Sequence, residues 1–112
     1  MVKTRVELEQ IAKAYVEKLR EKGIRAERVI VFGSYGRGTA TERSDIDLAF
    51  IAKDFDRYNL FQRQKLLASC RPGLVRTDVL AYSPSMLETR QKQSPLIQQI
   101  MSEGMTVFPV AA

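Results

Sequence analysis

Three aspartates are the residues of this sequence whose type and spacing could carry out chemistry. Asp45 and Asp47 stand two residues apart, and Asp78 lies in a later apolar run at 74–82. Residues i and i+2 of a strand point to the same face, roughly 6–7 Å apart. Carboxylates placed this way repel one another, and their burial is costly unless a cation compensates. The pair therefore suits Mg²⁺, which one or two carboxylates and substrate phosphates typically hold.

Each acid taken alone has an ordinary explanation. Asp45 and Asp47 could equally lie on the solvent-facing side of a strand, and Asp78 alone is better explained as an acid of an edge strand. Alternation places Asp78 on one face of its strand together with Arg76 and Leu80. If the two strands are neighbours, the three carboxylates form the set that a two-metal phosphoryl-transfer site uses.

A glycine–serine pair precedes the acids. Gly33 and Ser34 follow the β-branched run 28–32, and glycine allows both a sharp turn and close approach of a ligand. The serine hydroxyl and the following backbone N–H groups could bind an anion. Alone, the pair is better explained as a turn that ends a strand. The segment is not a P-loop, because Thr39 stands where lysine is required, and no third glycine follows Gly38 as a dinucleotide fingerprint needs.

Composition excludes several other classes of site. The chain contains no histidine, which excludes Ser-His-Asp or Cys-His nucleophile systems and zinc sites that use histidine. The single cysteine, Cys70, lies in an apolar segment and is expected to be a buried thiol. The net charge of +5 is spread along the chain without interleaved aromatic residues, so nucleic acid is a disfavoured partner.

The elements that must position these residues alternate between helix and strand. Thr4 and Glu7 have the spacing of a capping box, and the apolar residues that follow predict a helix over 4–22. The other predicted elements, in chain order, are a strand at 28–32, a turn with at most one helical turn at 35–44, a strand at 45–51, a helix at 56–70, a strand at 74–82, a helix opened by Ser83-Pro84, a helix capped by Ser94 and ended by Gly104, and an edge strand at 105–108.

This order predicts an α/β (α+β) fold in which about four helices flank a small mixed sheet of three to four strands. With 112 residues, 45% of them hydrophobic and 28% charged, residues 1–112 are expected to form a single domain. No apolar run approaches the roughly 20 residues needed to span a bilayer, and the first residues lack the apolar core of a signal peptide. A cytoplasmic location is expected.

The segment from Phe32-Gly33-Ser34 through Asp45-Ile46-Asp47-Leu48 resembles the signature of the DNA polymerase β-like nucleotidyltransferase superfamily. The full stretch 33–48 is similar in particular to the minimal nucleotidyltransferases of prokaryotes, many of which are paired with a small helical HEPN toxin. The later strand with Asp78 and the end at 100–104 look similar as well, so the resemblance covers about residues 5–108.

The resemblance implies a role for each matching residue. Gly33 and Ser34 would hold the β- and γ-phosphates of ATP, and the acids Asp45, Asp47 and Asp78 would ligate two Mg²⁺ ions, or Mn²⁺ in their place. Asp78 would also help to deprotonate the acceptor hydroxyl. The resemblance also implies that Arg37 and Arg43 contact phosphates of the nucleotide and that Ser44 orients the nucleotide-binding loop before the strand.

The acceptor is not encoded in these motifs. Only about thirty residues follow the Asp78 strand, so an acceptor site must be shallow or completed by a partner or a second copy. We expect an antitoxin that transfers AMP to a tyrosine of a cognate HEPN toxin. Two alternatives stay open: a non-catalytic module that neutralises its partner by binding, and a transferase that acts on a small molecule or an RNA end.

Overall fold

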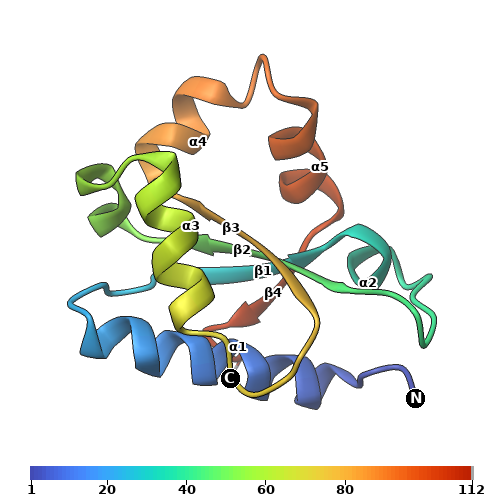
Figure 1. Cartoon of the computed structure of the whole chain (residues 1–112). Helices are drawn as coiled ribbons and strands as arrows, with labels where there is room; N and C mark the ends of the chain where they lie inside the picture. Colours follow the sequence, from blue (N-terminus) through green and yellow to red (C-terminus); the bar gives the residue numbers. More distant parts are fainter. Residues whose placement is uncertain (112) are drawn as a thin grey trace.

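A four-stranded sheet in the order β3-β2-β1-β4 forms the centre of the fold (Figure 1). β1 (Arg28–Phe32) pairs antiparallel with β2 (Ile46–Ile51) and with β4 (Met105–Phe108), and β2 pairs parallel with β3 (Thr77–Tyr82). The computed structural model describes residues 1–111. The mixed sheet of the predicted α/β fold is thus confirmed, with β4 on one of its edges.

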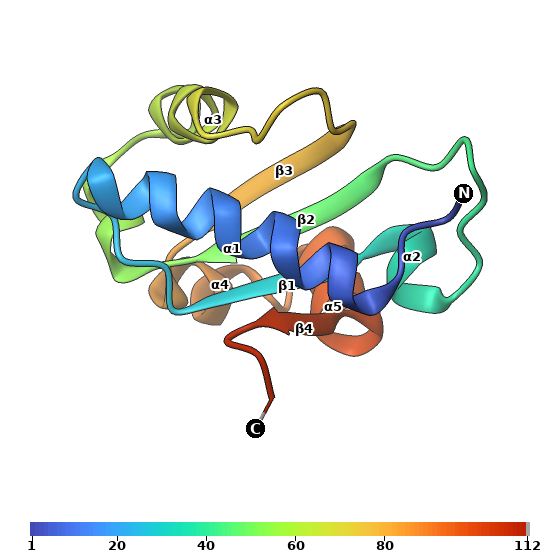
Figure 2. The same cartoon turned by 90° about the horizontal axis from the view of Figure 1, so that it is seen from below.

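Helices cover both faces of this sheet. α1 (Arg5–Glu21) and α3 (Leu60–Ser69) contribute to one buried apolar cluster, and α4 (Pro84–Arg90) and α5 (Pro95–Glu103) contribute to a second. Figure 2 shows α1 running along the sheet, with α4 and α5 behind it. Because helices bury both faces, β2 is apolar at nearly every position and its acid stands out.

Local signals in the sequence begin the helices. The Thr4 hydroxyl accepts from the backbone N–H of Glu7, and the Glu7 carboxylate accepts from the N–H of Thr4, which completes the predicted capping box of α1. Ser83 and Ser94 cap α4 and α5 through their hydroxyl oxygens, and a proline follows each serine at the first helical position. The helix starts predicted from these residues are confirmed.

The helix predicted over 56–70 is present but begins later, at Leu60. Residues Lys53–Arg57 form the 3-10 helix η1, which places Phe55 in the core, and the chain is extended at Tyr58. Asn59 then starts α3 with a capping box of its own, in which its side chain accepts from the N–H of Gln62. Two short elements, η1 and α3, therefore stand where one helix was predicted.

Three smaller differences concern the ends of elements. β2 begins at Ile46 rather than at residue 45, and β3 begins at Thr77 rather than at 74. Gly104 ends α5 as predicted, but its φ is −70°, so a left-handed backbone is not why glycine is needed. A Cβ at this position would collide with the Ile100 carbonyl oxygen and the Ile30 side chain. Glycine is needed here because the chain passes close to β1.

The structure settles two further expectations about the described residues. Cys70 is fully buried, as predicted for a structural thiol. Within residues 1–111, every helix is either too short or too polar to cross a bilayer.

Candidate active site

The antiparallel pairing of β1 with β2 brings the glycine–serine pair to the acids. Phe32, the last residue of β1, is the register partner of Asp47, and α2 (Gly33–Arg37) begins at the next residue. Gly33 has a φ of +64°, which favours glycine, and a Cβ there would collide with the Asp47 carboxylate. The glycine predicted from the motif is therefore required both by the backbone conformation and by the position of the acid.

The parallel pairing of β2 with β3 places the second acid beside the first. Asp47 and Asp78 are register partners, so both side chains leave the same face of the sheet. It is the face that α4 and α5 cover, since Ala49 and Ile51, on the same side of β2 as Asp47, belong to the second apolar cluster. Asp47 is half-buried and Asp78 is exposed. The two strands that carry Asp47 and Asp78 are therefore neighbours, which is the condition for these acids to share a site.

Repulsion between like charges is evident at Asp47. Burial raises the pKa of this carboxyl above its usual range, and the carboxylates of Asp78 and Asp45 raise it further, while Arg37 acts in the opposite direction. The ionised form of Asp47 is thus disfavoured by its own surroundings. Hard oxygen ligands with excess negative charge are the donor set that Mg²⁺ prefers, so these residues fit a divalent cation.

Asp45 does not join the other two acids. Its carboxylate pairs with the Arg76 guanidinium at 3.2 Å, and Arg76 also donates to the Arg43 carbonyl oxygen at 2.8 Å. Asp45 precedes β2 and is exposed. Across residues 1–111, no three carboxylate, histidine or cysteine side chains are gathered closely enough to hold one metal ion. The structure thus places Asp47 and Asp78 together and holds Asp45 to one side.

The predicted phosphate contacts fall into two groups. Ser34 and Arg37 lie on α2 next to the acids, and Arg37 also pairs with Glu103 of α5 at 3.4 Å. Arg43 and Ser44 instead line a separate cavity of about 280 Å³, together with Arg76. The Ser44 hydroxyl accepts from the N–H of Thr41 at 2.9 Å, so it fixes the loop before β2.

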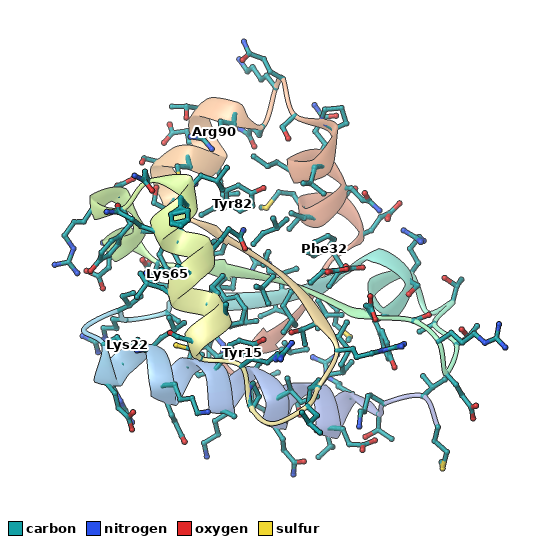
Figure 3. All side chains as sticks on the ribbon, viewed as in Figure 1. Tyr15, Lys22, Phe32, Lys65, Tyr82 and Arg90 are labelled. Atoms are coloured by element: carbon teal, nitrogen blue, oxygen red, sulfur yellow. The ribbon has the colours of Figure 1, made fainter. Side chains whose placement is uncertain are left out.

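An open cleft of about 540 Å³ lies over the two neighbouring acids. Its lining includes Phe32, Gln64, Leu80 and Leu96 in addition to the acids, and Figure 3 shows Phe32 just below α5. Sequence reasoning missed Gln64 and Leu96. Gln64 is half-buried and Leu96 is exposed, and no pattern in the sequence separates them from other positions on helix surfaces. Alternation along β3 could have indicated Leu80, which shares a face with Asp78.

Comparison with known families gives a match over most of the chain. The family model described as "Polymerase beta, Nucleotidyltransferase" matches residues 13–109. A Methanocaldococcus jannaschii protein named "Putative protein adenylyltransferase" is 33% identical over 104 residues, which are 92% of this chain and 70% of that protein.

Solved structures share the fold. A crystal structure of a "putative nucleotidyltransferase" from Sulfolobus solfataricus superposes with a TM-score of 0.63 at 21% identity, covering 91% of this chain and 80% of that one. The crystal structure of a toxin–antitoxin with AMP-PNP superposes with a TM-score of 0.56 at 26% identity, covering 86% of this chain and 71% of that one.

Proposed function

The chain belongs to the polymerase beta nucleotidyltransferase family, and on this premise we propose that it transfers AMP from ATP to a hydroxyl group of a protein acceptor. The observation that carries the proposal is the register pairing of Asp47 with Asp78, beside a glycine whose Cβ would displace Asp47. Two like charges held at the edge of a cleft suit a reaction that moves a phosphoryl group with a divalent cation.

Two similarities support ATP and a protein as the substrates. The M. jannaschii relative is named as a protein adenylyltransferase, and the neighbour at 26% identity is a toxin–antitoxin whose crystal structure contains AMP-PNP, an ATP analogue. We infer that the acceptor is the toxin of a toxin–antitoxin pair. In line with the resemblance of the motif, we assign the receiving group to a tyrosine of a HEPN-type toxin.

The transfer forms one bond and breaks one. The acceptor oxygen bonds to the α-phosphorus of ATP, the bond from this phosphorus to the oxygen that bridges to the β-phosphate breaks, and pyrophosphate leaves. Asp47 and Asp78, with Asp45 as a third ligand, would hold Mg²⁺, which would supply charge stabilisation for the α-phosphoryl group and for the entering and leaving oxygens. Asp78, which is exposed on β3, would take the proton of the acceptor hydroxyl.

The other residues position the nucleotide. Gly33 lacks a side chain that would block the approach of phosphates, and Ser34 offers a hydroxyl on the first turn of α2. Arg37 carries positive charge close to Asp47, where it can stabilise the leaving pyrophosphate. Phe32 and Leu96 give the cleft an apolar side in addition to its acids.

Labelled ATP tests the proposal directly. The chain is incubated with Mg²⁺, ATP labelled at the α-phosphate, and the proposed toxin partner, and label is expected on the toxin. Asp45→Asn should lose the labelling, whereas Glu88→Gln, which removes a charge from an exposed position on α4, should retain it. A toxin left unlabelled by the folded wild-type chain would contradict the proposal.

The same variants separate transfer from binding alone. If transfer is required, Asp45→Asn should fail to neutralise the toxin in cells while still co-purifying with it. Neutralisation by Asp45→Asn as complete as that by wild type would instead favour a non-catalytic antitoxin.

A further inference from the structure

A second groove of about 580 Å³ continues from the acid cleft along β3, between α3 and α4. It shares Gln64 and Leu80 with the cleft, so a ligand can lie in both at once. Figure 3 shows Tyr82 between α3 and α4, with Arg90 above it on α4. We call this the β3 groove; the residues of its lining that matter here are Leu60, Arg63, Gln64, Leu80, Tyr82 and Arg90.

Arg63 is the charged group at the base of the β3 groove. Only 4% of the residue is exposed, its Nε donates to the Ala81 carbonyl oxygen at 3.0 Å, and its Nη1 donates to the Tyr58 carbonyl oxygen at 2.8 Å. No buried side-chain nitrogen or oxygen in the described part of the chain lacks a partner. The remaining nitrogen, Nη2, makes no hydrogen bond within these residues and is therefore not fully buried, and Arg63 lines the groove.

A second cation stands close to the first. Burial lowers the pKa of Arg63, and the Arg90 guanidinium lowers it further by repulsion. Both arginines act on the pKa of Tyr82, which burial raises and the two positive charges lower. Two guanidinium groups and a phenol thus line the same groove, and an anion bound between the arginines would relieve their repulsion.

The chain supplies little negative charge to offset these cations. Within residues 1–111, Arg90 has no carboxylate at ion-pair distance, and no acidic side chain lines the β3 groove. The Asp56 carboxylate raises the pKa of Arg63, but it already accepts hydrogen bonds from Ser83 and Ser85. The β3 groove is therefore a pre-formed place for a carboxylate from another molecule.

We propose that the β3 groove binds an acidic segment of the protein acceptor, adjacent to the hydroxyl that receives AMP, with Arg63 and Arg90 contacting its carboxylates. This inference rests on the proposed function. A peptide fits better than a nucleic acid because apolar side chains line the groove together with the cations: Leu80 is one, and Leu60, which is 62% exposed, is another. Two arginines can pair with one or two carboxylates, whereas binding along the phosphate backbone of a nucleic acid uses a larger number of cations.

Two synthetic peptides test the inference. Each carries one tyrosine, flanked by aspartates in one peptide and by asparagines in the other, and transfer from labelled ATP with Mg²⁺ gives KM for each. The aspartate peptide should show a KM at least about tenfold lower, as expected for charge-assisted hydrogen bonds. Arg90→Gln should reduce this preference to less than about threefold, whereas Arg20→Gln, an exposed arginine on α1, should keep it.

Binding without transfer separates the two proposals. Versions of the peptides with phenylalanine in place of tyrosine cannot accept AMP, so their affinities report on the β3 groove alone. An aspartate preference in binding, with neither tyrosine peptide labelled, would contradict the proposed transfer and support the groove. Equal binding of the two phenylalanine peptides, or a preference that survives Arg90→Gln, would overturn the groove inference. If an oligoribonucleotide displaces both phenylalanine peptides and neither peptide binds more tightly than the other, the groove inference is also overturned. The groove would then be assigned to nucleic acid.

Discussion

Asp47 is the residue in which position and chemistry conflict most. It lies on a strand whose other residues are buried, next to Gly33 and opposite Asp78, and its surroundings favour the protonated form. A carboxyl with a raised pKa in the folded state destabilises the fold when it is ionised. Such a conflict is expected where a residue is retained for function rather than for stability.

Replacement of this acid should therefore have opposite effects on activity and stability. We expect Asp47→Asn to reduce AMP transfer by at least about a hundredfold, because loss of even an outer residue at a metal site costs up to that much. In the absence of metal, Asp47→Asn should raise the free energy of unfolding at pH 7 by on the order of 1 kcal/mol. The gain is small because Asp47 is partly exposed and solvent screens its charge. Urea unfolding in the presence of a chelator measures this gain.

The pH dependence of that gain follows from the direction of the pKa shift. The folded state binds the proton of Asp47 more tightly, so wild type loses stability as pH rises from the unfolded pKa, about 4, through the raised folded pKa. The difference between wild type and Asp47→Asn should vanish below about pH 4 and reach its full size above the folded pKa. Glu88→Gln should show no such dependence, and a destabilised Asp47→Asn at pH 7 would refute this account.

At the scale of elements, the junction of β1 and α2 holds the site together. β1 ends at Phe32, α2 begins at once, and the left-handed Gly38 ends α2 five residues later. The turn can be this abrupt because Gly33 and Gly38 both adopt a positive φ, of +64° and +77°. Only Gly33 also touches an acid, since nothing lies within 4 Å of a Cβ at Gly38.

This difference makes the two glycines a matched pair. Gly38→Ala should lower the free energy of unfolding by about 1–2 kcal/mol through backbone strain alone and leave AMP transfer in place. Gly33→Ala carries the same strain and in addition forces the Asp47 carboxylate aside, so it should be less stable by at least a further 1 kcal/mol or so and lose transfer. Thermal unfolding and labelled ATP measure the two effects. Equal losses from both alanines would show that contact with Asp47 does not matter.

At the scale of the whole molecule, the cleft lies where the sheet, α3 and α5 meet. Its lining comes from β1, β2, β3 and from one residue on each of these helices. A ligand bound here contacts elements far apart in the sequence, so it should stabilise the complete fold rather than one part of it.

A thermal-shift experiment tests this expectation. A non-hydrolysable ATP analogue at about 100 times its Kd contributes roughly 2.7 kcal/mol, which should raise Tm by on the order of 10 °C for a domain of this size. The shift should require Mg²⁺ and should disappear in Asp47→Asn, whose carboxylate is lost. A shift of the same size with EDTA present would show that the nucleotide binds without the acids.

The sequence by itself determined the local features of this protein. Capping residues such as Thr4 and Ser94 marked helix starts correctly, because a cap depends only on residues three positions away. The motif from Gly33 to Asp47 indicated the chemistry, because both the turn and the spacing of the acids are local properties. The start of the helix predicted over 56–70 was wrong, because residues 53–57 form a 3-10 helix that buries Phe55, and this burial depends on distant partners.

Only the tertiary structure decided which residues share a site. Pairing of β2 with β3 put Asp78 beside Asp47, whereas an ion pair with Arg76 holds Asp45 apart, and neither contact can be read from spacing along the chain. The cations of the β3 groove, Arg63 and Arg90, come from separate helices and look like ordinary surface charges in the sequence. Long-range contacts depend on how strands pair and helices pack, so spacing along the chain indicates the chemistry but not the complete site.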